Sequence, residues 1–343
     1  VKGLKKALFY STGKNYDIKA FTLKNDIIEL AADATTIDFT KGSNAMTITI
    51  DGSTIYALAA TTKSFYSSQG GEKGADYGAT GDAPQTFVIT NSTFYDLAGG
   101  KNFFSHRQNN QKWLKYEVKN NIFVNCGKAG QTIKGLNGGS QGSNPIWDID
   151  GNVFNSQYDS ENNRTEEMKD TGASEATGDA DEPVKNTIAG VVTFKDVATG
   201  DFNGTIAVDE EVAAVPGDPR WTITQKVNPV DVVVEATDIT DGKITDAIAA
   251  KAAGKPINNL TVNLAGGTNY TVTASMVVNG SVNIKAAGEG SAVIDASELS
   301  GNMIEMGDAA LTEKVAVDAI AIENVTVKGL KKALFYSTGK NYD

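Results

Sequence analysis

One short pattern of apolar and polar residues recurs along the chain and predicts its architecture. It consists of an aliphatic residue, any residue, Asn or Gly, two further residues and then an apolar residue, as in "ITNSTF" and "VKNNIF". Before the Asn or Gly the residues alternate between apolar and polar, which is the period of a strand with one buried face. The aliphatic anchors of its six occurrences are Leu23, Ile50, Ile89, Val118, Ile149 and Ile322.

The Asn or Gly position predicts a bend between two strands. Both residue types tolerate the left-handed backbone region, so the chain can turn there and a second strand can begin at the apolar residue three positions on. The residues at this position are Asn25, Gly52, Asn91, Asn120, Gly151 and Asn324.

The spacing of the anchors indicates a solenoid. The first five lie 27, 39, 29 and 31 residues apart, which suits one coil plus loops of varying length. Stacked coils of two or three short strands form a parallel β-helix. A β-sandwich is the alternative, but it gives no reason for one bent motif to repeat.

Residues 240–254, "TDGKITDAIAAKAAG", predict an amphipathic helix that caps one end of the stack. We expect Thr240 or Asp241 to cap its start and Gly254 to end it. Ile244, Ile248 and the alanines give the helix an apolar stripe. A solenoid needs such a cap because its end coils leave strands unpaired.

The helix is followed by "LTVNLAGGTNYTV" and by a coil that ends in "VNIKAAGEG". This order resembles the N-terminal part of pectin-lyase-like right-handed β-helix proteins, in which an amphipathic helix caps the first coil. The segment "VPGDPRW" at residues 215–221 resembles the C-terminus of a Bacteroidetes family of surface β-helix proteins of unknown function, as do the coils themselves. The resemblance implies an all-β, right-handed parallel β-helix with a capping helix at about 241–254, at a bacterial cell surface or secreted.

The chain begins and ends with the same seventeen residues, "VKGLKKALFYSTGKNYD", at 1–17 and 327–343. The resemblance implies that residues 1–221 form the C-terminal coils and terminal strands, and that 222–343 form the capping helix and N-terminal coils of the same β-helix. An engineered circular permutation, a window cut from identical tandem units and a circular reconstruction of one unit each explain the duplication.

A single β-helix has one place for the duplicated coil. We expect the second copy to be displaced, to add a coil, or to dock head to tail on a neighbouring molecule. Its lysines are expected to be solvated. The inward residues are either Leu4, Leu8 and Tyr10 or, in the opposite register, Ala7 and Phe9.

Composition excludes several classes of protein. The net charge of −11 without a basic tract argues against nucleic acid. One histidine and one cysteine, Cys126, provide neither a zinc site nor an internal disulfide, and no apolar run reaches the 18 residues of a membrane span. We expect no cofactor and no metal: "DIDGN" at 148–152 resembles half a calcium loop, but Ile149 should point inward and the carboxylates outward. The acidic stretch 159–182 is expected to be a solvated loop.

The stretch "FFSHRQNNQKW" is the candidate glycan-binding site, because flat apolar rings and planar polar groups suit sugars. In the alternative interpretation Phe103 and Phe104 are packing residues and His106 satisfies a backbone group. Cys126 and Trp221 are expected to be packing residues. The candidate ligand-binding residues are Phe103, Phe104, His106, Arg107, Gln111 and Trp113, with Tyr116 and Trp147 on the same face.

The sequence lacks the catalytic groups of this fold. Its lyases need a Lys or Arg base facing a groove, and its hydrolases need close carboxylates with a histidine nearby. We therefore expect no catalytic residues and a non-catalytic surface or secreted protein, glycan-binding or adhesin-like, whose partner is a polysaccharide or a host or cell-surface glycan. The alternative is a polysaccharide lyase or glycoside hydrolase with an atypical site.

Overall fold

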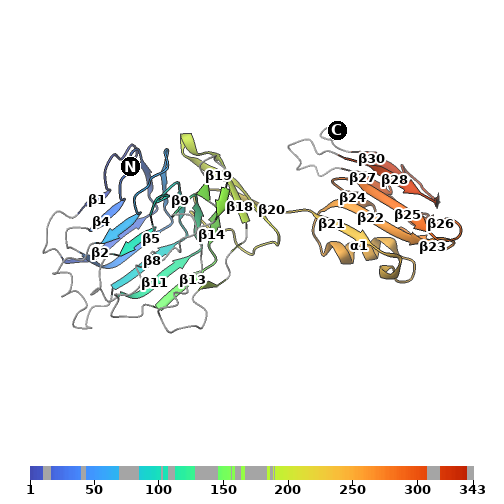
Figure 1. Ribbon diagram of the computed structural model, residues 1–343, viewed down its shortest axis with the longest axis horizontal. Coiled ribbons are helices and arrows are strands. Elements are labelled where there is room, and N and C mark those ends of the chain that lie inside the picture. The colour runs from blue at the N-terminus through green and yellow to red at the C-terminus, as the bar shows by residue number, and fades with distance from the viewer. Residues whose placement is uncertain are drawn as a thin grey trace. The chain divides into compact units, whose positions relative to one another are not determined.

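In the computed structural model the chain divides into two compact units, Val1–Lys226 (unit 1) and Val227–Asp343 (unit 2) (Figure 1). Arg107, Gln111 and most of the stretch 159–182 lie outside the residues that the structure describes. The structure describes residues 1–10, 17–39, 44–68, 85–101, 103–106, 113–127, 146–155, 157–158, 164–166, 184–185, 188, 190–306 and 317–337.

Unit 1 contains three sheets in which every described strand pair is parallel. In chain order, the first is β2 (Asp17–Lys24), β5 (Asn44–Asp51), β8 (Gln85–Thr90), β11 (Trp113–Lys119), β13 (Ile146–Asp150) and β17 (Val184–Lys185). The second is β3 (Ile27–Leu30), β6 (Thr54–Ala57), β9 (Thr93–Tyr95), β12 (Ile122–Val124) and β14 (Val153–Asn155). The third is β1 (Phe9–Tyr10), β4 (Ile37–Phe39), β7 (Tyr66–Ser68) and β10 (Phe104–His106).

The register of these sheets confirms the repeated pattern. The anchors Leu23, Ile50, Ile89, Val118 and Ile149 are successive partners across the first sheet. The apolar residues three positions beyond the bend are partners across the second sheet, from Ile28 to Phe154. All six Asn or Gly residues at the bend have φ between 50° and 63°. The pattern therefore sets both the bend and the stacking of one coil on the next.

The core of unit 1 follows this register. Phe94, Phe123 and Phe154 stack with centroids 5.0 and 5.1 Å apart and planes within 8° of parallel. Such columns bury the inward face of each coil against the coils on either side.

Antiparallel strands follow the parallel stack of unit 1. β18 (Gly190–Asp196), η2 (Val197–Thr199) and β19 (Asp201–Val208) form a hairpin that β20 (Ile223–Val227) extends. β15 (Gln157–Tyr158) pairs antiparallel with β16 (Arg164–Glu166), so the stretch expected to be a loop contains a short strand.

Unit 2 is a second stack of parallel strands in three sheets. The first is β21 (Val230–Val234), β22 (Ile257–Ala265), β25 (Val282–Ala287) and β28 (Ile320–Glu323). The second is β23 (Asn269–Thr271), β26 (Ala292–Asp295) and β29 (Val325–Lys328). The third is β24 (Met276–Val278), β27 (Ile304–Met306) and β30 (Phe335–Ser337), and η3 (Ala236–Asp238) follows β21.

The predicted helix is present as α1 (Ile244–Ala252), and it packs against β21 at one edge of its sheet. It buries Ile244, Ala247, Ile248 and Ala252. The predicted N-cap is wrong: Asp241 has a φ of 53°, and Lys243 takes the N-cap position without a side-chain hydrogen bond to the helix. The chain makes a left-handed turn before the helix begins.

Both units are stacks of parallel strands, and this arrangement is compatible with a parallel β-helix. The antiparallel β-sandwich does not fit, because its strands pair in the opposite sense.

Candidate functional site

The structure places Phe103 and Phe104 in the core. Both side chains are 0% exposed, and Phe103 stacks on Phe65 with centroids 4.8 Å apart. These two rings are packing residues, as the alternative interpretation of the sequence has it, and they offer no face to a sugar.

The other predicted site residues are placed only by their strands. His106 ends β10 and pairs in register with Ser68, and Trp113 begins β11. Tyr116 on β11 and Trp147 on β13 are register partners. The predicted glycan contacts of these residues, and those of Arg107 and Gln111 outside the described residues, stay predictions.

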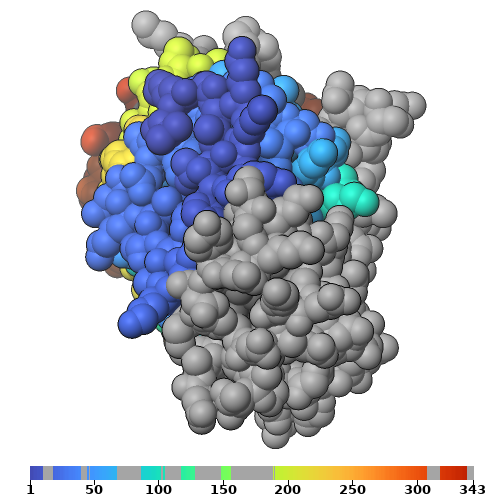
Figure 2. All heavy atoms as spheres, turned by 90° about the vertical axis from the view of Figure 1, so that its left-hand side faces the viewer, coloured from blue at the N-terminus to red at the C-terminus, as the bar shows by residue number. Residues whose placement is uncertain are grey.

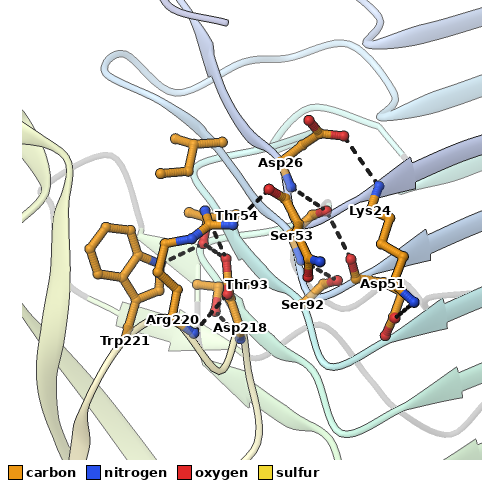
Figure 3. A network of polar contacts seen from close by, with 12 residues as sticks. Lys24, Asp26, Asp51, Ser53, Thr54, Ser92, Thr93, Asp218, Arg220 and Trp221 are labelled. Atoms are coloured by element: carbon orange, nitrogen blue, oxygen red, sulfur yellow. Dashed lines mark hydrogen bonds and ion pairs between the residues drawn. The ribbon is translucent and has the colours of Figure 1, made fainter.

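A cavity of about 410 Å³ lies where residues 214–223 cross the bends of the unit 1 coils. Its lining includes the amide residues Asn91 and Asn120, the indole of Trp221 and two prolines, Pro216 and Pro219. Figure 3 shows the polar network beside this cavity, in which Trp221 and Arg220 approach Thr54 and Asp218.

The segment 217–221 is fixed by hydrogen bonds to four successive coils. The amide of Gly217 donates to the carbonyl of Asn120 at 2.8 Å, and the amide of Asp218 donates to Thr93 Oγ1 at 3.1 Å. Trp221 Nε1 donates to Thr54 Oγ1 at 2.7 Å, and Arg220 donates to the carbonyl of Asn25 at 2.7 Å. The segment therefore runs back across the stack, from the fourth coil towards the first, counting the coil of residues 17–39 as the first.

Asp218 holds this segment together from within. Its side chain is 1% exposed and forms an ion pair with Arg220 at 3.5 Å. Its Oδ2 accepts from Thr54 Oγ1 at 2.7 Å, and its Oδ1 accepts from the amide of Arg220 at 3.0 Å. Both carboxylate oxygens are thus occupied, so Asp218 acts as a clamp, and among the described residues it is the one ionisable residue that lines the cavity.

A polar ladder, buried in most of its links, connects the residues that directly follow the bends and was missed from the sequence. Each residue directly after the bend donates its amide to the side chain at the same position of the next coil. The links run from Asp26 to Ser53 (3.1 Å), Ser92 (3.1 Å), Asn121 (2.9 Å) and Asn152 (3.0 Å). The signal in the sequence is a small polar residue after the bend, as in "DGS", "TNS" and "KNN".

Asp51 borders this ladder at the end of β5. Burial raises the pKa of its carboxyl group, but hydrogen bonds from Asn91 and Thr90 and the charge of Lys24 outweigh burial and lower the pKa overall. Asn91 Nδ2 lies 3.1 Å and Thr90 Oγ1 lies 2.9 Å from Asp51 Oδ1. The carboxylate therefore orients the Asn91 amide at the edge of the cavity.

A second cavity, of about 540 Å³, lies in unit 2 beside α1. Its lining includes Ile248, Ala249, Met276 and Val277, and no described residue of this lining carries an aromatic ring. It lacks a flat surface on which a sugar ring can stack, so the cavity beside Trp221 is the stronger candidate.

The interpretation of two other sequence features agrees with the structure. Ile149 is 1% exposed, as expected for an inward residue, and the side chain of Asp148 is 32% exposed and pairs with Lys119 at 2.8 Å. Cys126 is 1% exposed, burial raises the pKa of its thiol, and its Sγ donates to the carbonyl of Val124 at 3.3 Å. Within the described residues no group of three His, Cys, Asp or Glu side chains is placed to hold a metal ion.

Over the described part of the chain, no helix has the length and apolar character needed to cross a membrane. No protein-family model, curated protein or solved structure matches the chain.

Proposed function

We propose that this protein is a non-catalytic β-helix protein of a bacterial cell surface, or a secreted one, that binds a glycan in the cavity beside Trp221. The observation that carries the proposal is this cavity of about 410 Å³, which combines an indole with asparagine side chains and prolines. Its size lies within the range of small-molecule binding sites.

The indole of Trp221 supports binding because its position is fixed before a ligand arrives. Its Nε1–H is committed to Thr54, and its ring packs on Phe202 with centroids 5.8 Å apart. A sugar ring can stack its apolar face on such an indole while amides contact its hydroxyl groups. Preorganisation of this kind lowers the entropic cost of binding.

The finer fold assignment is part of the same proposal. The helix with its following strands, and the segment "VPGDPRW", resemble pectin-lyase-like proteins and a Bacteroidetes surface family. We take both units as portions of right-handed parallel β-helices, and the surface location follows from this resemblance.

The proposal is tested by a glycan array followed by affinity measurements on the variant Asn120→Gly. Glycine keeps the left-handed backbone, as Gly52 and Gly151 do at equivalent positions, and removes the amide that lines the cavity. We expect affinity to fall by about three- to tenfold, the loss of one or two hydrogen bonds. Asn324→Gly is the matched control, because it makes the same change at the bend in unit 2.

Equal affinities of the two variants, or no glycan bound on the array, would count against this site. A parallel assay on acidic polysaccharides addresses the alternative of a lyase or hydrolase. Unsaturated or shortened products would contradict a purely binding role.

A further inference from the structure

The two copies of the duplicated segment pair with different coils in the part that the structure describes, residues 1–10 and 327–337. The first copy pairs with the coil that follows it, residues 27–39. The second copy pairs with the coil that precedes it, residues 292–306. The same sequence is therefore paired with a following coil in the first copy and with a preceding coil in the second copy.

The first copy is bound through its backbone to unit 1. The amide of Leu4 donates to the carbonyl of Glu29 at 3.0 Å, and the carbonyl of Leu4 accepts from Ala31 at 2.8 Å. The amide of Leu8 donates to the carbonyl of Thr36 at 2.9 Å. Phe9 is the register partner of Ile37.

The second copy is bound through complementary groups to unit 2. The carbonyl of Leu334, the counterpart of Leu8, accepts from Ile304 at 3.0 Å. The carbonyl of Ala333 accepts from Met303 at 3.0 Å. Phe335, the counterpart of Phe9, is the register partner of Ile304.

These bonds use different groups of the same residues, so one coil can make both sets. The segment uses the Leu8 amide towards residues 27–39, and it uses the carbonyl of the equivalent Leu334 towards residues 292–306. The side-chain columns also continue, because the phenylalanine stands beside Ile304 in one copy and beside Ile37 in the other.

The second copy lacks the cover that the first copy has. Leu334 and Phe335 are 37% and 38% exposed. In the first copy Leu8 and Phe9 pack against the core of unit 1, and the Phe9 ring lies 4.9 Å from that of Phe39. The apolar side chains that are exposed in the second copy are thus the equivalents of those that the core of unit 1 covers in the first copy.

The two surfaces that carry these pairings are each formed by the outermost strands of three sheets. The strands β28, β29 and β30 each end their sheet in unit 2, as β1, β2 and β3 do in unit 1. Figure 2 looks at the corresponding face of unit 1, where the N-terminal residues in blue lie at the surface.

We infer that unit 2 of one molecule docks onto unit 1 of a second molecule, with residues 327–336 taking the place of residues 1–10 on that second molecule. Phe335 then lies beside Ile37, Tyr336 beside Asp38, and Ile322 beside Leu23. The contact is head to tail, so repeated docking gives chains of molecules of increasing length.

Exchange of the two copies is favoured over stacking one copy on the other. In-register stacking would set Lys2, Lys5 and Lys6 directly opposite their counterparts Lys328, Lys331 and Lys332. Like charges directly opposite each other on neighbouring strands are destabilising. Exchange leaves one copy at the junction and avoids these three pairs.

A disulfide cross-link tests the register of the junction. The full chain with Tyr336→Cys is mixed, under oxidising conditions, with a chain that lacks residues 1–17 and carries Asp38→Cys. Adjacent partners in a parallel ladder lie within the Cα separation that a disulfide spans, so we expect a disulfide-linked pair of the two variants. Cys126 is buried and its raised thiol pKa keeps it unreactive.

The matched control is the full chain with Val233→Cys in place of Tyr336→Cys. Val233 is 50% exposed, close to the 48% of Tyr336, but it lies on β21, at the opposite end of its sheet from β28. It should give no cross-link with the Asp38→Cys chain. If the truncated chain does not fold, as judged by circular dichroism, the full chain with Asp38→Cys serves as the acceptor.

Light scattering gives an independent readout. The mean mass of the chain lacking residues 1–17 should rise with concentration, whereas a chain lacking both copies should keep the mass of one molecule. A cross-link yield equal to that of the Val233→Cys control, or a mass that does not depend on concentration in the first chain, overturns the inference.

Discussion

At the scale of single residues, the two glycines among the bends of unit 1 have a steric origin, whereas Asn91, whose Nδ2 donates to Asp51 Oδ1, is followed by Asn120 in the next coil. A Cβ atom at Gly52 would lie 2.6 Å from Asn25 Oδ1, and one at Gly151 would lie 2.5 Å from Asn120 Oδ1. Where the preceding coil carries an asparagine whose side chain lies over the bend, the next coil has room only for glycine. The sequence predicts the backbone conformation at these positions, but not which coil carries which residue, because that choice depends on the neighbouring coil.

Gly52→Ala is expected to lower the free energy of unfolding by about 2–3 kcal/mol. About 1–2 kcal/mol comes from the left-handed backbone, and the remainder comes from the contact with Asn25. Gly254→Ala is the matched control, because Gly254 also has a positive φ, of 81°, but nothing lies within 4 Å of its added Cβ. Denaturant unfolding of both variants measures the difference, and equal losses would exclude the steric account.

The lowered pKa of Asp51 predicts how the free energy of unfolding depends on pH. Its pKa is lower in the folded protein, so it stabilises the fold above its unfolded pKa of about 3.9, and this contribution is lost as the pH falls through the folded value. Asp51→Asn should therefore be less stable at neutral pH and lose less stability on acidification. Denaturant unfolding at several pH values checks this, and pH curves that run parallel for the two proteins would be inconsistent with it.

At the scale of elements, the strands and the helix are predictable because local periodicity encodes them. The start of α1 is not, since Asp241 and Gly242 both adopt positive φ and delay the helix to Ile244. The cavity beside Trp221 is also not predictable from local pattern. It exists only because residues 217–221 return across coils that lie far away in the sequence. Phe103 and Phe104 illustrate the same limit: adjacent aromatic residues next to polar ones can belong to a site or to a core, and here they belong to the core.

The cap function of α1 is tested by Ile248→Ala. Ile248 is 5% exposed and lies in the core of unit 2, so its truncation should cost about 2–4 kcal/mol of unfolding free energy. Asp246→Ala on the exposed face of the same helix should change stability by less than about 0.5 kcal/mol. Thermal or denaturant unfolding of both variants measures this, and similar losses would show that the buried stripe does not hold the helix in place.

At the scale of the whole molecule, each unit is a stack in which a coil touches mainly its neighbours. Such stacks ordinarily lose their ends first, since a terminal coil has a neighbour on one side only. The duplicated segment supplies a strand at one end of a sheet in each unit. Its complementary pairing in the two copies became visible only in the structure.

The segment 217–221 changes how unit 1 comes apart. Because it binds Asn25, Thr54, Thr93 and Asn120 at once, the first coil cannot open without releasing bonds that also hold the coils behind it. We expect Asp218→Ala, which removes the clamp, to speed amide hydrogen exchange most in residues 17–28, with little change in residues 257–265 of unit 2. Equal acceleration in both places would point to a global loss of stability instead. The five residues thus hold the first coil in place by connecting it to coils with which it makes no direct contact, so that the coils of unit 1 resist opening one at a time.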